Sequence, residues 1–210
     1  MKPQKAVLTA DIVNSSTLGE KQLDELLFAV KTELKGQKAK SDFYRGDSFH
    51  ALCDIEQALT LALRLRAIAK QSDPKDKSED IDIRIAIGIG PVEEPIKNMA
   101  TAKGEAFMLS GRELDLLSKT SDRLALRCAD KKIDAGLQGI AVFVDLLMQK
   151  MSSKQAETVG ELLMGATQME AAKKLKKSQS TINKLAKAAN WSEMEKAIGI
   201  YRKLVSLITE

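Results

Sequence analysis

The chain has 210 residues, of which 44% are hydrophobic and 30% charged, and its formal net charge is +4. This is the composition of an ordinary globular protein, and the length suffices for one large core or two small ones. No apolar run approaches the roughly 20 residues of a membrane-spanning helix. Met1-Lys2-Pro3 leads directly into a strand-like segment, so we expect neither a signal peptide nor contact with a membrane.

Cysteine and histidine are scarce. Cys53 and Cys128 lie in strand-like segments without CxxC spacing, so we expect buried, reduced thiols and a cytoplasmic protein. The single histidine, His50, excludes histidine-rich metal sites and argues against a Ser-His-Asp triad. We expect it to be a half-exposed strand residue.

Hydrophobic periodicity predicts the elements in chain order. The predicted strands are 5–13, 41–44, 48–53, 81–89 and 123–128. Of the three predicted helices between these strands, the first ends near Gly36 and the others cover 55–70 and 105–119. The predicted hairpin turn is Arg45-Gly46-Asp47, and residues 71–80 are predicted to be a solvated loop. From about Lys131 onward the patterns are helical only.

The order β-α-β-β-α-β-α-β followed by helices predicts an α+β fold with two domains. Residues 1–130 fit a ferredoxin-like domain, an antiparallel-leaning sheet with helices on one face. Residues 131–210 are expected to form an all-α domain. The long helix 131–151 joins the two, and its wide apolar face fits either a dimer contact or packing within the monomer.

Four segments within residues 5–128 resemble, in motif order, the class III nucleotidyl cyclases. They are Ala10–Ser16 after the first strand, Gly46–Phe49 on the hairpin, Ile83–Gly90 and Gly104–Arg112. This resemblance implies a nucleotidyl cyclase-like domain in which Asp11 and Asp47 bind Mg²⁺ or Mn²⁺ and Arg112 binds a nucleotide. Such chemistry needs hard carboxylates for the metal and donors for the developing charge. The alternative is that Asp11 caps a turn, Asp47 holds the hairpin, and Arg112 is a surface residue or an ion-pair partner.

Two positions depart from that family. Met108 stands where the resemblance places an Asn, and Phe43 stands where it places a base-selecting Lys. A thioether cannot orient a ribose, and a phenyl ring cannot donate a hydrogen bond to a purine. We therefore expect no catalytic residue and no family-type cyclase activity.

Residues 168–187 predict a helix-turn-helix. Ala172 allows the two helices to cross closely, Leu175, Ile182 and Leu185 are spaced to pack them together, and Lys176 occupies the turn position usually held by Gly. A left-handed backbone there costs a non-Gly residue roughly 1 kcal/mol. The run Gln179–Lys184 resembles the recognition helix of phage-repressor and sigma-like families.

The predicted DNA contacts are polar residues of this motif, with Ser178 also capping the second helix. They are Gln168, Ser178, Gln179, Ser180, Thr181, Asn183, Lys184 and Lys187. Charge follows the same division, because residues 131–210 carry 13 Lys+Arg against 8 Asp+Glu, whereas residues 1–130 carry 20 against 21. Residues 166–190 hold six Lys and one Glu, as phosphate neutralisation would require. The alternative is a helical hairpin with a solvated basic face.

The combination of a degenerate cyclase-like half with a helix-turn-helix resembles the bacterial SatD-like family. The expected function is transcription regulation by a homodimer that binds double-stranded DNA and uses its first domain as a sensor, of a nucleotide or another small molecule, or as a dimerisation module. One alternative is an enzyme that binds a nucleoside triphosphate through Asp11 and Asp47. Another is a scaffold whose basic hairpin binds RNA or a protein.

Overall fold

The computed structural model describes residues 3–44, 46–72, 81–96 and 98–209. Arg45 of the predicted turn and residues 73–80 of the predicted loop lie outside this part, as do Met1 and Lys2. The strands are β1 (Gln4–Val13), β2 (Lys40–Tyr44), β3 (Ser48–Cys53), β4 (Asp82–Pro91) and β5 (Leu124–Cys128). The helices are α1 (Glu20–Gly36), α2 (Ala58–Gln71), α3 (Glu105–Leu117), α4 (Lys131–Gln149), α5 (Ser153–Leu163), α6 (Gln168–Lys174), α7 (Gln179–Ala188) and α8 (Trp191–Thr209). The predicted order of elements is confirmed.

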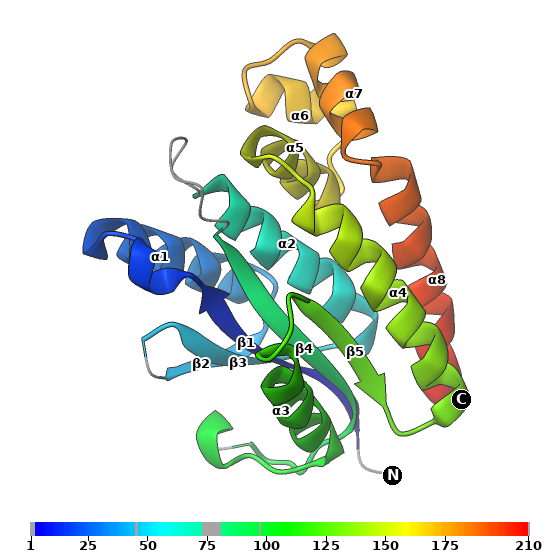
Figure 1. The fold of residues 1–210 in the computed structure, drawn as a ribbon. Coiled ribbons are helices and arrows are strands. Elements are labelled where there is room, and N and C mark those ends of the chain that lie inside the picture. Colours follow the sequence, from blue (N-terminus) through cyan, green and yellow to red (C-terminus); the bar gives the residue numbers. More distant parts are fainter. Residues whose placement is uncertain (1–2, 45, 73–80, 97, 210) are drawn as a thin grey trace.

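The five strands form one mixed sheet in the order β2-β3-β1-β4-β5 (Figure 1). The pairs β2–β3, β3–β1 and β1–β4 are antiparallel, and β4–β5 is parallel. The first four strands with α1 and α2 therefore have the ferredoxin-like arrangement. The fifth strand is added through α3, because two parallel neighbours need a crossover connection.

The helices are not confined to one face of the sheet, and that expectation was wrong. Leu8 and Ala10 of β1 belong to the main core beneath α1 and α2, whereas Val7 packs with Ala106 of α3 on the other face. Both faces of the central strands are apolar, so both must be covered. A Cβ at Gly88 of β4 would lie 2.2 Å from the Ala106 carbonyl oxygen, so α3 can lie this close only because residue 88 is glycine.

One hydrophobic core runs through both predicted domains. The main cluster contains residues of the sheet, α1 and α2, and it continues into α4, α5 and α8. In α8, Tyr201 is fully buried and donates a hydrogen bond of 2.5 Å to the carbonyl of Ile55. The boundary near residue 130 therefore does not divide the core, and the two-domain division stays a prediction about independent folding.

A fully buried guanidinium joins the sheet to the helices that follow it. Arg66 of α2 donates to both oxygens of Asp82, at 2.9 and 2.7 Å, and to Asp145 of α4 at 2.7 Å. Burial alone would lower the pKa of Arg66, but the charges of Asp82 and Asp145 raise it above its usual value. The cation is therefore retained in the core, bonded to β4 and α4 at once.

The remaining composition-based expectations concern single side chains and membrane spans. Cys53 and Cys128 are free and buried, and His50 is half-buried on β3, as predicted. None of the helices in the described ranges has the length and apolar character needed to cross a bilayer.

Candidate functional site

Two short helices, α6 and α7, form the tip of the helical part (Figure 1). The Thr167 hydroxyl accepts from the Glu170 N–H, and Glu170 accepts from the Thr167 N–H, so a capping box starts α6. Ser178 Oγ accepts from the Thr181 N–H at 3.1 Å and starts α7, as the sequence predicts. Between them Lys176 has φ 52°, the left-handed backbone expected at this turn position.

A small second core holds these helices on α5. It consists of Leu162, Ala171, Ala172, Ile182 and Ala186, with Leu175 and Trp191 packed against it. Ala172 and Ile182 are buried where α6 meets α7, which is the packing that their spacing predicts. Because alanine fills the contact on α6, the two helix backbones lie close together, and the other side of α7 remains free for solvent.

The outer side of α7 carries the predicted DNA-contacting residues. Gln168 is half-buried at the start of α6, and the other seven are exposed, namely Ser178, Gln179, Ser180, Thr181, Asn183, Lys184 and Lys187. These seven therefore form one polar, partly basic surface without a carboxylate. Whether this surface contacts DNA stays a prediction.

Two of the six lysines within residues 166–190 form ion pairs inside the helical part. Lys174 pairs with Glu161 of α5 at 2.8 Å, and Lys177 pairs with Glu157 of the same helix. Lys173, Lys176, Lys184 and Lys187 are exposed, and no ion pair involves them among the described residues. The positive charge available to a ligand is therefore about that of four lysines, fewer than the sequence count suggests.

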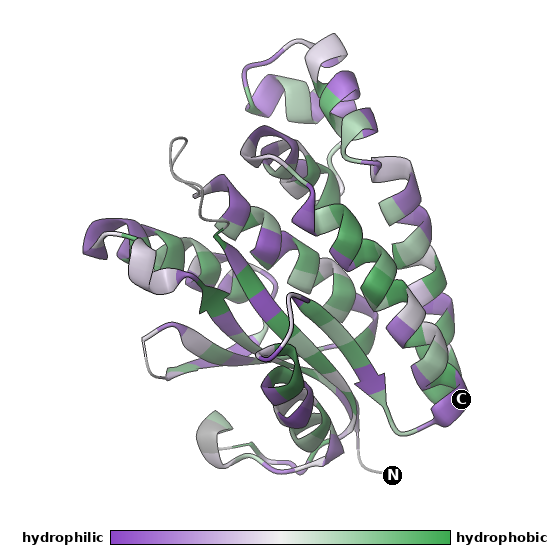
Figure 2. Cartoon of the chain, in the orientation of Figure 1, coloured by the Kyte–Doolittle hydropathy of each residue, from purple (hydrophilic) through white to green (hydrophobic). Residues whose placement is uncertain are grey.

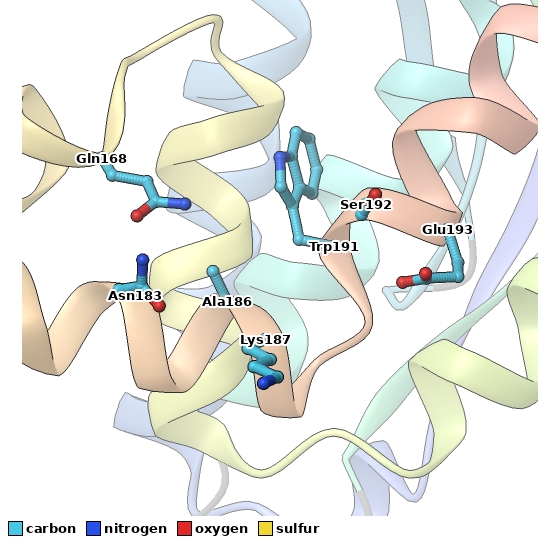
Figure 3. A pocket seen from close by; sticks show the side chains of 7 residues that line it. All are labelled: Gln168, Asn183, Ala186, Lys187, Trp191, Ser192 and Glu193. Carbon is cyan, nitrogen blue, oxygen red and sulfur yellow. The ribbon is translucent and has the colours of Figure 1, made fainter.

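A pocket of about 360 Å³ opens where α6, α7 and α8 meet (Figure 3). The amide ends of Gln168 and Asn183 point toward each other, and the indole of Trp191 lies beside them. Trp191 also packs against the small second core. Its spacing along α8 predicts this packing. Its position beside Gln168 and Asn183 depends on the turn between α7 and α8, which hydrophobic periodicity does not predict.

The two carboxylates of the cyclase-like motifs lie together at one end of the sheet. Asp11 is paired across the β1–β3 ladder with Ser48, the neighbour of Asp47, and the Ile12 N–H donates to the Asp47 carbonyl at 3.1 Å. Burial raises the pKa of Asp11, Arg84 lowers it, and the charge of Asp47 raises it further. Two adjacent carboxylates fit a divalent cation whose coordination water completes.

Both carboxylates also have protein partners. Arg84 of β4 lies opposite Asp11 in the ladder and donates to its Oδ2 at 2.8 Å, while Ser15 donates to Asp47 at 2.7 Å. The Oδ1 of Asp11 is buried and has no hydrogen-bond partner. In the part of the chain that the structure describes, no third His, Cys, Asp or Glu joins the pair as a metal ligand. A metal ion would therefore use Asp11 Oδ1 and Asp47 and would lie beside a guanidinium.

The other cyclase-like positions do not join this pair. Met108 and Arg112 are exposed on α3, and within the described ranges Arg112 makes no hydrogen bond or ion pair with Asp11 or Asp47. Phe43 stacks on Phe49 with ring centroids 5.0 Å apart, and the Lys31 ammonium lies 4.8 Å from its centroid. Phe43 therefore acts as a packing residue in this chain.

Comparison with known proteins yields partial structural likenesses. No family model and no curated protein matches the sequence. A bacterial light-regulated adenylyl cyclase is similar over 60% of this chain and 76% of its own, with 18% identity and a TM-score of 0.48. An adenylyl cyclase from P. aeruginosa is similar over 55% of this chain and 73% of its own, with 15% identity and a TM-score of 0.42. The active GGEEF domain of a diguanylate cyclase from Vibrio cholerae is similar over 61% of this chain and 84% of its own, with 14% identity and a TM-score of 0.42. All three TM-scores lie below 0.5, so nothing about activity, ligands or assembly is carried over to this chain.

Proposed function

We propose that the protein is a DNA-binding transcription regulator and that α7 enters the major groove of double-stranded DNA. The observation that carries this proposal is the outer surface of α7. It presents amides, hydroxyls and two lysines to solvent, while Ile182 and Ala186 hold the helix on α5 and α6. A ten-residue helix is about 15 Å long, and the major groove, about 12 Å wide, admits a helix.

The contacts divide by position along α7. Gln179 lies in the first turn, where a recognition helix meets base edges, and an amide there can bond adenine at two points. Lys184 and Lys187 lie in later turns and suit phosphates. Gln168 and Trp191 border the same surface across the pocket (Figure 3), so their N–H groups suit a phosphate that flanks the groove.

In this proposal the α+β part is a non-catalytic sensor or dimerisation module. Met108 and Phe43 cannot supply the amide and ammonium of the cyclase-like pattern. The pair Asp11 and Asp47 remains available for a metal-bound nucleotide or another small effector. The proposed combination of parts is the one that resembles the SatD-like family.

The test is binding of fluorescent duplex DNA, followed by anisotropy over a salt series. With three or four of the exposed lysines on phosphates, log Kd should change with log salt by roughly 3 per subunit. Lys184→Ala should weaken all sequences alike and reduce that slope by about one unit. Gln179→Ala should weaken binding to a selected cognate site by about 1–3 kcal/mol, and it should change binding to random DNA little.

The matched control is Lys21→Ala, which removes the same charge from an exposed position on α1 and should leave the slope unchanged. If the protein ignores duplex DNA at low salt, or if Lys184→Ala behaves like the control, α7 does not read the groove. The basic surface would then belong to the alternative, a solvated hairpin or a site for RNA or a protein.

The second candidate function is an enzyme that acts on a nucleoside triphosphate through Asp11 and Asp47. The buried, unpartnered Oδ1 of Asp11 favours it, because a carboxylate oxygen without a donor is suited to a cation. This candidate requires metal binding at the pair.

A further inference from the structure

The outward side of α4 is uncharged over three turns. Its exposed positions after Lys132 are Ala135, Gln138, Gly139, Val142, Phe143 and Leu146. A helix that faces water normally presents charged side chains there, and the inner side of α4 is already buried in the main core. Figure 2 shows the hydrophobic character along this helix. The outer stripe is therefore an apolar surface without a partner in the described part of the chain.

Helix α8 runs antiparallel beside α4 (Figure 1), and next to the stripe it exposes Ile200 together with the charged Glu193 and Lys196. Val142 is 70% exposed and Ile200 of α8 is 52% exposed. Between the helices lies a groove of about 420 Å³, bordered by Gly136, Gly139 and Phe143 of α4 and by Ala197 and Ile200 of α8. A Cβ built on Gly139 meets no atom within 4 Å. The surface thus has the ring of Phe143, which is 41% exposed, at the border of a shallow, glycine-lined groove.

We propose that a second copy of this chain covers this surface, with α4 packed against α4 of the other copy. A two-fold contact brings the same patch of both copies together, so the patch must complement itself. An uncharged stripe meets this condition, because no charge faces its own copy. The ring of Phe143 and the groove at Gly139 lie on one patch, so each copy can insert the ring into the groove of the other.

The face of α4 and α8 approaches the size of a standard dimer interface when the charged margin on α8 is counted together with the apolar stripe. Helices α4 and α8 have 19 residues each, so their whole face is about 28 Å long and about 20 Å wide, roughly 550 Å² in projection. The uncharged stripe Ala135–Leu146 covers about 16 Å of that length. A side-chain surface exceeds its projection, and a standard interface buries about 800 Å² per partner. Glu193 and Lys196 lie at the border of the groove, which gives the apolar centre a polar rim.

The orientation of the two copies rests on the proposed function. Helices α6 and α7 lie at one end of α8 (Figure 1). A two-fold axis along α4 brings both α7 helices to the same end, where they can meet half-sites about 34–36 Å apart. An axis perpendicular to α4 would place them at opposite ends. We therefore infer a parallel α4 pair.

The first experiment measures the mass of the full chain in solution by light scattering and sedimentation, without DNA. The wild type should be a dimer, and Val142→Asp should be a monomer with an unchanged circular dichroism spectrum. The matched control is Phe28→Asp, which changes an equally exposed apolar residue on α1 and should remain dimeric. A monomeric wild type, or loss of the dimer in the control as well, would overturn the proposed interface.

A second variant separates the interface from folding. Gly139→Leu places its side chain in open space within one chain and replaces a residue of low helix propensity. The melting temperature of the monomer should be kept or raised, while the dimer dissociation constant should rise by about tenfold or more. An unchanged dissociation constant would contradict the packing of α4 on α4.

Cross-linking with a short bis-maleimide tests the orientation. In a parallel pair, Ala135→Cys and Leu146→Cys should each link to the same residue of the other copy. In an antiparallel pair the two positions cannot both do so, because they are about 16 Å apart along the helix. Cys53 and Cys128 are buried and should give no link. A dimer that ignores DNA would defeat the proposed function alone, whereas a monomer that binds DNA would defeat this interface alone.

Discussion

Asp11 is subject to opposing electrostatic effects. Burial raises the pKa of its carboxyl, the Arg84 guanidinium lowers it, and the neighbouring Asp47 raises it. The net result is a raised pKa, so protonation of Asp11 begins at a higher pH than for an ordinary aspartate. A cation at Oδ1 would replace the proton and oppose the repulsion from Asp47. Metal binding at this pair is therefore linked to pH.

Millimolar Mn²⁺ should raise the melting temperature at pH 8 if the pair binds metal, since a ligand of the folded state stabilises it by mass action. Because the pKa of Asp11 is raised, the gain should shrink as the pH falls toward 5. Differential scanning fluorimetry measures both effects. Asp47→Asn should remove the gain, and Asp24→Asn, an exposed carboxylate on α1, should keep it. An unchanged melting temperature in the wild type would leave Asp47 with its hairpin role, bonded to Ser15, and would remove the support for the enzyme alternative.

At the scale of elements, Arg66 connects parts of the chain that are far apart in sequence. Its guanidinium bonds Asp82, 16 residues away, and Asp145, 79 residues away. The other oxygen of Asp145 accepts from the Arg123 N–H at 2.8 Å, next to β5. One cation thus fixes α2, β4 and α4 in relation to one another. The buried Lys70 supports the same arrangement, since its ammonium lies 3.8 Å from Asp82 and donates to the Gln149 carbonyl of α4.

Arg66→Ala should lower the free energy of unfolding by about 3–5 kcal/mol, because Asp145 and Asp82 would lose their buried guanidinium and only Lys70, 3.8 Å from Asp82, would remain. For a chain of this size that is a fall in melting temperature of roughly 10 °C. Urea unfolding followed by circular dichroism measures it. Lys21→Ala removes an exposed cation that pairs with Glu25 and should change the free energy by less than about 1 kcal/mol. A loss in Arg66→Ala no larger than in this control would mean that the buried pair contributes little.

Periodicity and turn chemistry predict most elements of this fold. The alternation in β4, the Ser178 cap and the left-handed turn at Lys176 are local properties, and local sequence is enough to find them. The strand order and the partner of Asp11 are not local. Arg84 faces Asp11 only because β1 and β4 pair in one register, which hydrophobic alternation does not specify. Asp145 is a charged residue on the apolar side of a predicted helix, and this is the feature of the sequence that indicates a buried partner such as Arg66.

The same limit explains why the proposed DNA surface was only partly predictable. Which side of α7 faces solvent follows from Ile182 and Ala186, of which the sequence predicts Ile182. Leu185, also predicted to pack the two helices, is half-buried and is not part of the small core. The ion pairs that occupy Lys174 and Lys177 depend on how α5 packs beside α6. A count of lysines therefore overstates the charge that a ligand meets.

At the scale of the whole molecule, the main hydrophobic core contains residues of both domains that the sequence predicts. Residues of α4, α5 and α8 lie in one cluster with the sheet, and α4 packs on β5. Helices α6 and α7 pack in a small separate cluster with Leu162 of α5, and α3 packs on the other face of the sheet in two further small clusters. A signal received at the sheet would reach α7 through packed helices and not through a flexible linker.

Thermal unfolding of the full chain should therefore be a single cooperative transition. Fluorescence of the only tryptophan, Trp191, reports on the helical tip, and far-ultraviolet circular dichroism reports on the whole chain, so the two curves should coincide. A fragment of residues 1–130 would lack the helices that bury Leu124 and Leu126, and it should show no cooperative transition. Two separated transitions, or a cooperatively folded fragment of residues 131–210, would instead show that the boundary near residue 130 separates two domains that fold independently, with the contacts of Arg66 and Tyr201 forming only after each has folded.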